Sequence, residues 1–182
     1  MATPTTLPAT FVAGNVLTAA QMNNLRGAFR VLQVVSTTKT DTFTATTGTG
    51  YSDITGLTVT ITPSATSSQI LIVSMITSGL NTSGGFTLVR GATPIGVGAT
   101  AGSRRSISTG YNQPTSNANQ GMGSFIISVL DSPATTSATT YKIQATGDQA
   151  GSIIYVNRGQ TDLDNITHMR GASTITAMEI SA

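Results

Sequence analysis

The sequence contains no cysteine and no tryptophan, and its 182 residues include one histidine, His168, and one glutamate, Glu179. Without cysteine the fold needs no disulfide bond, and nothing requires an oxidising compartment. A zinc site needs three or four histidine, cysteine or carboxylate ligands, which such a chain is poorly equipped to supply. No serine lies in a Gly-x-Ser-x-Gly motif. We therefore expect a protein without enzymatic activity, cofactor or metal ion.

Charged residues are also scarce. They make up 9% of the chain and leave a net charge of +2, whereas an average soluble domain has about 25%. Nucleic-acid binding would need a basic stripe, but the longest run of like charge is Arg104-Arg105. The apolar runs are too short to cross a membrane, and the N-terminus does not look like a secretion signal. We expect neither a nucleic-acid nor a membrane partner, and a protein that is made in a cytosol and stays soluble there or leaves it by a route that needs no secretion signal.

Hydroxyl residues take the place of the missing charges. The chain has 34 threonines and 19 serines. Threonine is β-branched and favours a pleated, half-exposed surface. A hydroxyl surface with little charge repels copies of itself only weakly, so it suits a protein that packs against sister subunits or a larger shell.

From residue 31 onward, apolar and polar residues alternate with the period of a β-strand. The clearest case is 57–61, where Leu57, Val59 and Ile61 alternate with threonines and Pro63 follows. Residues 69–78 and 124–131 are apolar on both faces, which predicts buried strands. Further strands are expected at 85–90, 93–98, 141–146, 152–158 and 173–180. With no helices between them, these strands predict an all-β fold, an antiparallel jelly-roll-like β-sandwich formed by a domain of residues 31–182.

Residues 1–30 have a different pattern. Residues 1–10 contain two prolines and predict an extended arm, while Thr18 and Gln21 fit a capping box that begins a short α-helix over 18–28. Three turns are too few for a stable isolated helix, so we expect it to dock on a partner or across one end of its own sandwich. The apolar residues expected to anchor the subunit or hold copies together are Phe11, Val12, Leu17, Met22, Leu25 and Phe29.

Two long loops are expected, at 99–121 and 157–172, and long loops in compact domains are often functional. The first contains Arg104, Arg105 and Tyr111, residue types that stack on sugars or bind carboxylates. They are candidate receptor contacts, with subunit contacts or plain solvation as the alternative. The second contains His168 and the run 162–165, which resembles part of a calcium loop but lacks its glycine and distal glutamate, so we interpret it as a polar turn.

Several segments together resemble a family of bacteriophage virion structural proteins from marine and cyanobacterial phages, either tail-fibre-like or head-decorating. They are residues 11–23 (FVAGNVLTAAQMN), 31–41 (VLQVVSTTKTD), 53–63 (DITGLTVTITP), 130–141 (LDSPATTSATTY) and 173–180 (STITAMEI). The resemblance implies a phage-encoded, trimeric surface protein of the virion that is assembled in the host cytoplasm and contacts other capsid or tail proteins. It supplies no catalytic residues.

Three functional readings follow. The first is a non-enzymatic homotrimeric appendage, a head-decorating knob or a short tail fibre, anchored by its N-terminal segment. The second is a tail module that recognises a host surface glycan, which would present aromatic side chains on one face, although only four tyrosines and no tryptophan are present. The third is a polysaccharide depolymerase, for which no local pair of carboxylates is evident.

Overall fold

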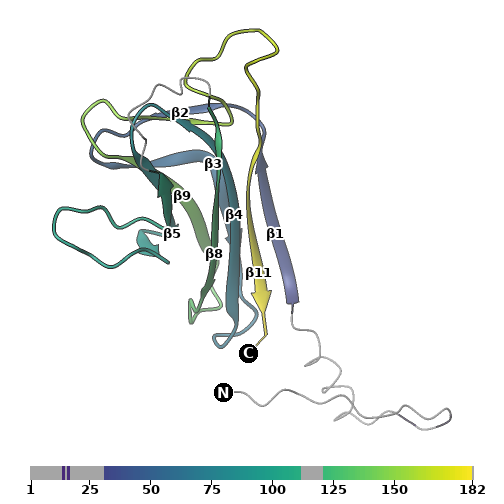
Figure 1. Ribbon diagram of the computed structural model, residues 1–182. Helices are drawn as coiled ribbons and strands as arrows, with labels where there is room; N and C mark the ends of the chain where they lie inside the picture. The colour runs from purple at the N-terminus through teal and green to yellow at the C-terminus, as the bar shows by residue number, and fades with distance from the viewer. Residues whose placement is uncertain (1–13, 15, 17–30, 112–120, 182) are drawn as a thin grey trace.

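The computed structural model describes residues 14, 16, 31–111 and 121–181 (Figure 1). Its regular structure consists of eleven strands. They are β1 (Val31–Lys39), β2 (Phe43–Thr46), β3 (Tyr51–Ile61), β4 (Gln69–Leu80), β5 (Gly84–Arg90), β6 (Thr93–Ile95), β7 (Thr109–Tyr111), β8 (Gly123–Asp131), β9 (Thr139–Gly147), β10 (Ile153–Val156) and β11 (Ser173–Ile180). Within the described ranges there is no helix. The predicted helix over 18–28 and all six predicted anchoring residues lie outside those ranges.

The strands form two antiparallel sheets. Sheet A has the order β1-β11-β4-β10-β2, with β8 paired to the other edge of β4, and sheet B has the order β3-β9-β5-β6, with β7 also paired to β5. Both β10 and β11 pair along one edge of β4, at Ser78–Leu80 and Gln69–Met75. Likewise β6 and β7 share one edge of β5. Each of these pairs is one strand line interrupted by a loop.

When β1 and β2, β6 and β7, and β10 and β11 are each counted as one line, the fold has eight strands in two sheets of four. Sheet A then has the order first, eighth, third, sixth, and sheet B the order second, seventh, fourth, fifth. This is the double Greek key of a jelly roll. The predicted all-β, antiparallel jelly-roll sandwich is confirmed.

The core lies between the two sheets and follows from the alternation along each strand. Ile70, Ile72 and Ile76 of β4 are fully buried against residues of sheet B such as Leu88 and Ile143. Burial of side chains of this size contributes roughly 1.5–3 kcal/mol each. The rings of Phe86 and Phe125, 5.1 Å apart, join the sheets near one edge. The sandwich therefore has a continuous apolar interior.

The observed strands differ from the expected ones in three places. β7 lies inside the predicted loop 99–121, because Thr-Gly-Tyr carries no alternation. β3 begins at Tyr51, and a bulge between Asp53 and Thr58 breaks its pattern; Gly56 there has φ +88°. The strand predicted over 124–131 is present as β8, but it is not buried on both faces: it is an edge strand whose Ile126 is 65% exposed.

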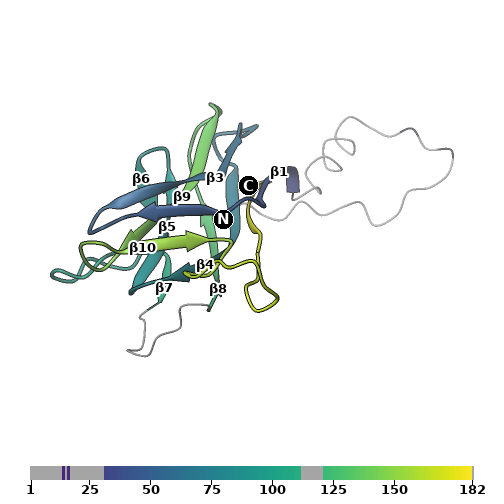
Figure 2. The same cartoon turned by 90° about the horizontal axis from the view of Figure 1, so that it is seen from above.

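The two ends of the sandwich are different. β1 begins and β11 ends at the lower end of Figure 1, where Val31 pairs with Ile180. The loop 157–172, together with β2 and β10, lies at the opposite end, which faces the viewer in Figure 2. The nine residues of β1 separate these ends by about 30 Å at roughly 3.3 Å per residue.

Candidate functional site

The outward-facing side of sheet A is apolar in one row that crosses all four strand lines and in part of a second row. In one row, Val34, Met178, Leu71 and Leu130 are register partners from β1 to β8. Val34 is 57% and Leu130 52% exposed. The next outward-facing row, two residues further along the strands, consists of hydroxyl side chains and one valine. In this row the hydroxyls of Ser36 and Thr176 are hydrogen-bonded at 2.8 Å. We call this surface the outer face of sheet A.

The second apolar part of the outer face of sheet A lies one row further along. Met75 and Ile126 are partners there, 41% and 65% exposed, beside Thr174 and Thr38. None of the outward-facing residues of these strands is charged. They are Val31, Val34, Ser36 and Thr38 of β1, Thr174, Thr176, Met178 and Ile180 of β11, Gln69, Leu71, Val73, Met75 and Thr77 of β4, and Ser124, Ile126, Ser128 and Leu130 of β8.

The outward-facing side of sheet B differs because it carries charge. Asp53 of β3 accepts hydrogen bonds from Lys142 at 2.7 Å and Gln144 at 2.8 Å, both on β9. These two donors hold the pKa of Asp53 below its ordinary value. The contrast between the sheets makes the uncharged outer face of sheet A a distinctive surface rather than a general property of the protein.

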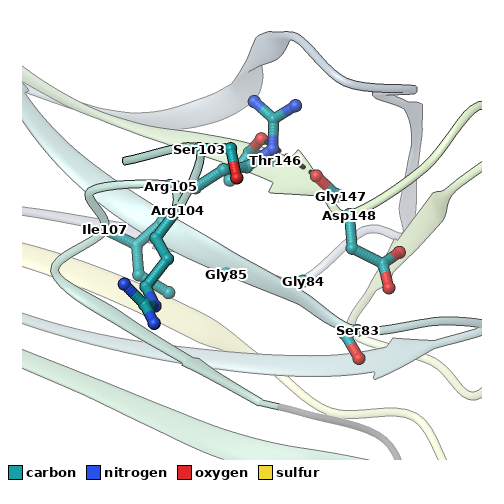
Figure 3. A pocket seen from close by; sticks show the side chains of 10 residues that line it. All are labelled: Ser83, Gly84, Gly85, Ser103, Arg104, Arg105, Ile107, Thr146, Gly147 and Asp148. Atoms are coloured by element: carbon teal, nitrogen blue, oxygen red, sulfur yellow. Dashed lines mark hydrogen bonds between the residues drawn. The ribbon is translucent and has the colours of Figure 1, made fainter. Parts of the chain in front are cut away.

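A second candidate site is a groove of about 500 Å³ beside β5, formed by the loop between β6 and β7 (Figure 3). Its lining includes Gly84 and Gly85 of β5, and a side chain at Gly85 would overlap Ile107 of the loop. The Tyr51 hydroxyl donates to the Ser106 carbonyl oxygen at 3.0 Å, which ties the loop to β3. The groove thus depends on glycines that let the loop lie close to the sheet.

The predicted receptor-loop arginines both line this groove, with Asp148 also in the lining. Figure 3 shows the two guanidinium groups on different sides of the loop. Arg104 is exposed and Arg105 is half-buried, and among the described residues the Arg105 side chain has no hydrogen bond or ion pair. Tyr111 of β7 pairs with Gly84 of β5 and is 40% exposed, but it is not among the lining residues.

The loop 157–172 is closed at its base by Asn157, which is fully buried with φ +62°. Its side-chain amide donates to the carbonyl oxygens of Lys39 at 2.9 Å and Asp41 at 2.8 Å, where β1 turns towards β2. Its Oδ1 accepts from the Ser173 hydroxyl at 2.6 Å, and its carbonyl oxygen from the Gly171 amide at 3.0 Å. Asn157 therefore holds together the two places where strand lines of sheet A are interrupted, the turn between β1 and β2 and the loop between β10 and β11.

Within that loop, the expected polar turn has a clear basis. Asp162 is paired with Arg170 at 2.8 Å and lies 3.9 Å from Arg158. Asn165 Oδ1 accepts from the Thr167 amide at 3.0 Å and lies 2.8 Å from His168 Nδ1, so the histidine is bonded within its own turn. Across the described ranges, no three His, Cys, Asp or Glu side chains form a group that could hold a metal ion.

Two buried carboxylates were not identified from the sequence. Glu179 accepts from the Ser64 amide and hydroxyl at 2.7 and 2.6 Å, and from Gln33 Nε2 at 2.6 Å. Burial raises the pKa of Glu179, but the hydrogen bonds from Ser64, Gln33 and Ser68 outweigh it and lower the pKa to about 2. Glu179 is thus an ionised carboxylate that ties β1, β11 and the turn after β3 together.

Asp131 connects the sheets. It accepts from Arg90 Nη1 at 2.9 and 2.8 Å and from the Tyr141 hydroxyl at 2.7 Å. Burial and the adjacent Asp131 carboxylate raise the pKa of Tyr141 above its ordinary value. No sequence spacing signals this cluster, because β5, β8 and β9 meet only in the fold.

No helix in the described part of the chain has the length and apolar character of a membrane span. No protein-family model matches the chain, and no curated protein does either. Among similar solved structures is that of infectious bursal disease virus, Gx strain, to a chain of which this protein is 17% identical with a TM-score of 0.36. The alignment covers 82% of this chain and 38% of that chain. At this similarity we draw no functional inference from it.

Proposed function

We propose that the protein is a non-enzymatic structural component of a bacteriophage virion. It forms a trimeric surface appendage, a head-decorating knob or a short tail fibre, anchored by its N-terminal segment. The observation that carries this proposal is the polarity of the sandwich. The anchoring segment joins the domain at Val31, at the end where β11 also finishes, and the loop 157–172 lies at the opposite end (Figure 1).

The placement of the acidic groups supports a structural role. Asp131 joins the two sheets, Asp53 joins β3 to β9, and Glu179 holds a turn against sheet A. Asp162 is neutralised within its loop by arginine, and Asp41 is paired with Lys39 at 2.7 Å. These carboxylates are occupied in holding the fold, which is the arrangement expected of a protein selected for rigidity and packing.

The anchoring assignment is tested by deleting residues 1–28 and measuring binding to phage particles that lack this protein. We expect the full chain to bind and the truncated chain to remain folded without binding. A matched control removes only residues 1–10, which spares Phe11 through Phe29 and retains binding. Particle binding by the chain lacking 1–28, at the level of the full chain, would contradict the anchor.

A trimer has a mass three times the chain mass of 18.6 kDa, and light scattering on the purified protein measures it.

A particle labelled at this subunit and imaged by electron microscopy would distinguish the head from the tail. Incubation with host polysaccharide should release no new reducing ends; release that disappears when individual aspartates are replaced would contradict the non-enzymatic assignment.

The groove beside β5 favours a second candidate function, recognition of a host surface glycan. Gly84 and Gly85 line this groove, and the guanidinium of Arg105, which is unpaired among the described residues, is able to donate to hydroxyls or a carboxylate. Binding to host polysaccharide that is weakened by Arg105→Ala, and unaffected by Arg170→Ala in the other loop, would support this function. Equal binding by both variants would exclude the groove.

A further inference from the structure

We propose that the outer face of sheet A is the surface through which three copies of this chain pack around a threefold axis that runs parallel to the strands. This inference rests on the proposed trimer and specifies which surface builds it.

The composition of the outer face of sheet A fits burial against another protein. Exposed Val34, Leu130, Met75 and Ile126 lie on it, and no charged residue is among its outward-facing positions. Interface cores are depleted of charge and enriched in apolar side chains relative to the remaining surface. Exposed apolar side chains that gather on one face of a domain mark such an interface. The absence of positive charge does not suit nucleic acid or an anionic membrane.

The partner most suited to this face is a copy of it, because its rows run across the strands. Around an axis parallel to the strands, residues at the same position along the strands meet in all three copies. The row containing Leu71 then meets the same row of its neighbours, and the row containing Thr176 meets hydroxyls. Within a row, the β1 side of one copy faces the β8 side of the next, so Val34 approaches the neighbour's Leu130 position.

The dimensions agree with three copies. Four strand lines spaced by about 4.8 Å give a face about 19 Å wide, and eight residues along β4 give a length of about 26 Å. Three walls about 19 Å wide enclose a triangle whose walls lie about 5.5 Å from the axis, close to half the roughly 10 Å spacing of sheets packed face to face. Each face measures about 500 Å² in projection and is shared between two neighbours, so the trimer buries three such faces around its axis, and each pairwise contact is smaller than the roughly 800 Å² per partner of a standard interface.

This arrangement is also consistent with the polarity of the sandwich. An axis parallel to the strands brings the three Val31 residues, to which the N-terminal segments are joined, to one end of the trimer. The three loops 157–172 lie together at the other end (Figure 1).

A charge placed on the outer face tests the inference. Ile126→Glu should yield a folded chain of 18.6 kDa by light scattering, because position 126 is exposed in the single subunit but buried in the trimer. The matched control, Thr140→Glu at an exposed position on sheet B, should remain trimeric. Circular dichroism and cooperative urea unfolding establish that both variants are folded.

Cross-linking gives a second readout that needs no loss of assembly. The protein has no cysteine of its own, and Val34 and Leu130 lie three strand spacings apart, about 14 Å, too far for a disulfide within one chain. The Val34→Cys, Leu130→Cys double variant should therefore form disulfide-linked trimers on mild oxidation. Each single variant should form at most linked dimers.

The outcomes separate this inference from the function on which it rests. A monomeric wild-type chain overturns both. A wild-type trimer that survives Ile126→Glu and gives no cross-linked trimer overturns the outer face as the interface and leaves the trimer standing. If Ile126→Glu lowers the stability of the full chain but not of the chain lacking 1–28, the N-terminal segment covers the face and the inference is wrong.

Discussion

Replacing Glu179 with glutamine should remove a large, pH-dependent part of the stability of this domain. The carboxylate is fully buried and ionised, and it accepts hydrogen bonds from Ser64 and Gln33. Glutamine would keep an acceptor towards Ser64, but its amide group would face the amide of Gln33, donor against donor. The variant therefore loses the charge-assisted bonds, and one buried donor has no acceptor.

The size of the effect follows from the pKa of Glu179, which is about 2 in the folded chain against an ordinary value of 4.5. At 1.36 kcal/mol per pH unit, this difference corresponds to about 3 kcal/mol. Because the folded pKa is depressed, the contribution is fully present above about pH 4.5. It is lost as the pH falls towards 2, where less than about 0.5 kcal/mol remains.

Urea unfolding followed by circular dichroism measures this directly, at one protein concentration so that assembly does not vary. Wild type and Glu179→Gln should differ by about 3 kcal/mol at pH 7 and converge near pH 2. The control is Asp164→Asn, at an exposed carboxylate, which should follow the wild type at every pH. A gap of equal size at pH 7 and pH 2, or no gap at pH 7, would refute the role assigned to ionised Glu179.

Three further substitutions test the packing, each by urea unfolding at pH 7. Thr87 has a fully buried hydroxyl without a partner in the described structure, so Thr87→Val should stabilise the domain by about 1 kcal/mol. Thr146→Val removes a hydrogen-bonded hydroxyl and should destabilise the domain by a similar amount. Equal effects of the two substitutions would contradict the difference between a bonded and an unbonded buried hydroxyl. Asn157→Ala should lower the free energy of unfolding by about 3–4 kcal/mol, because three hydrogen bonds are lost and alanine is strained in the left-handed backbone conformation. Asn157→Gly should lower it by about 1 kcal/mol less, because glycine adopts this conformation without strain. Identical losses would show that the backbone conformation does not matter. Gly96→Ala should destabilise by about 2 kcal/mol, because its φ is +60° and a side chain would overlap Val129; no change would mean that the loop shifts freely.

The jelly roll was predictable because its strands alternate strictly. The run 57–61 puts threonine outside and aliphatic side chains inside, the run 173–180 alternates with the same period, and both are strands in the structure. Strands were missed where the alternation of apolar and polar residues is interrupted or too short. The bulge at residues 54–57 hides the first half of β3, and β7 is too short to show a pattern.

The residues that tie the fold together were less accessible to sequence reasoning. Glu179 is separated by more than one hundred residues from Ser64 and Gln33, and nothing local pairs them. The apolar outer face of sheet A did leave a signal. The run 69–78 is apolar on both faces, which predicts a central strand, and β4 does lie between β11 and β8 in sheet A. In the structure, Met75 on its second face is 41% exposed.

Asn157 has a consequence for how this protein can diversify. Because its hydrogen bonds close the base of the loop 157–172, and Arg158 and Arg170 form a β-bridge just beyond it, residues 159–169 lie outside the strand register. Peptides of different length and composition can replace them while β10 and β11 keep their pairing with β4. The end of the sandwich opposite Val31 and Ile180 is thus a natural grafting position, where new surface chemistry is introduced without redesign of the framework.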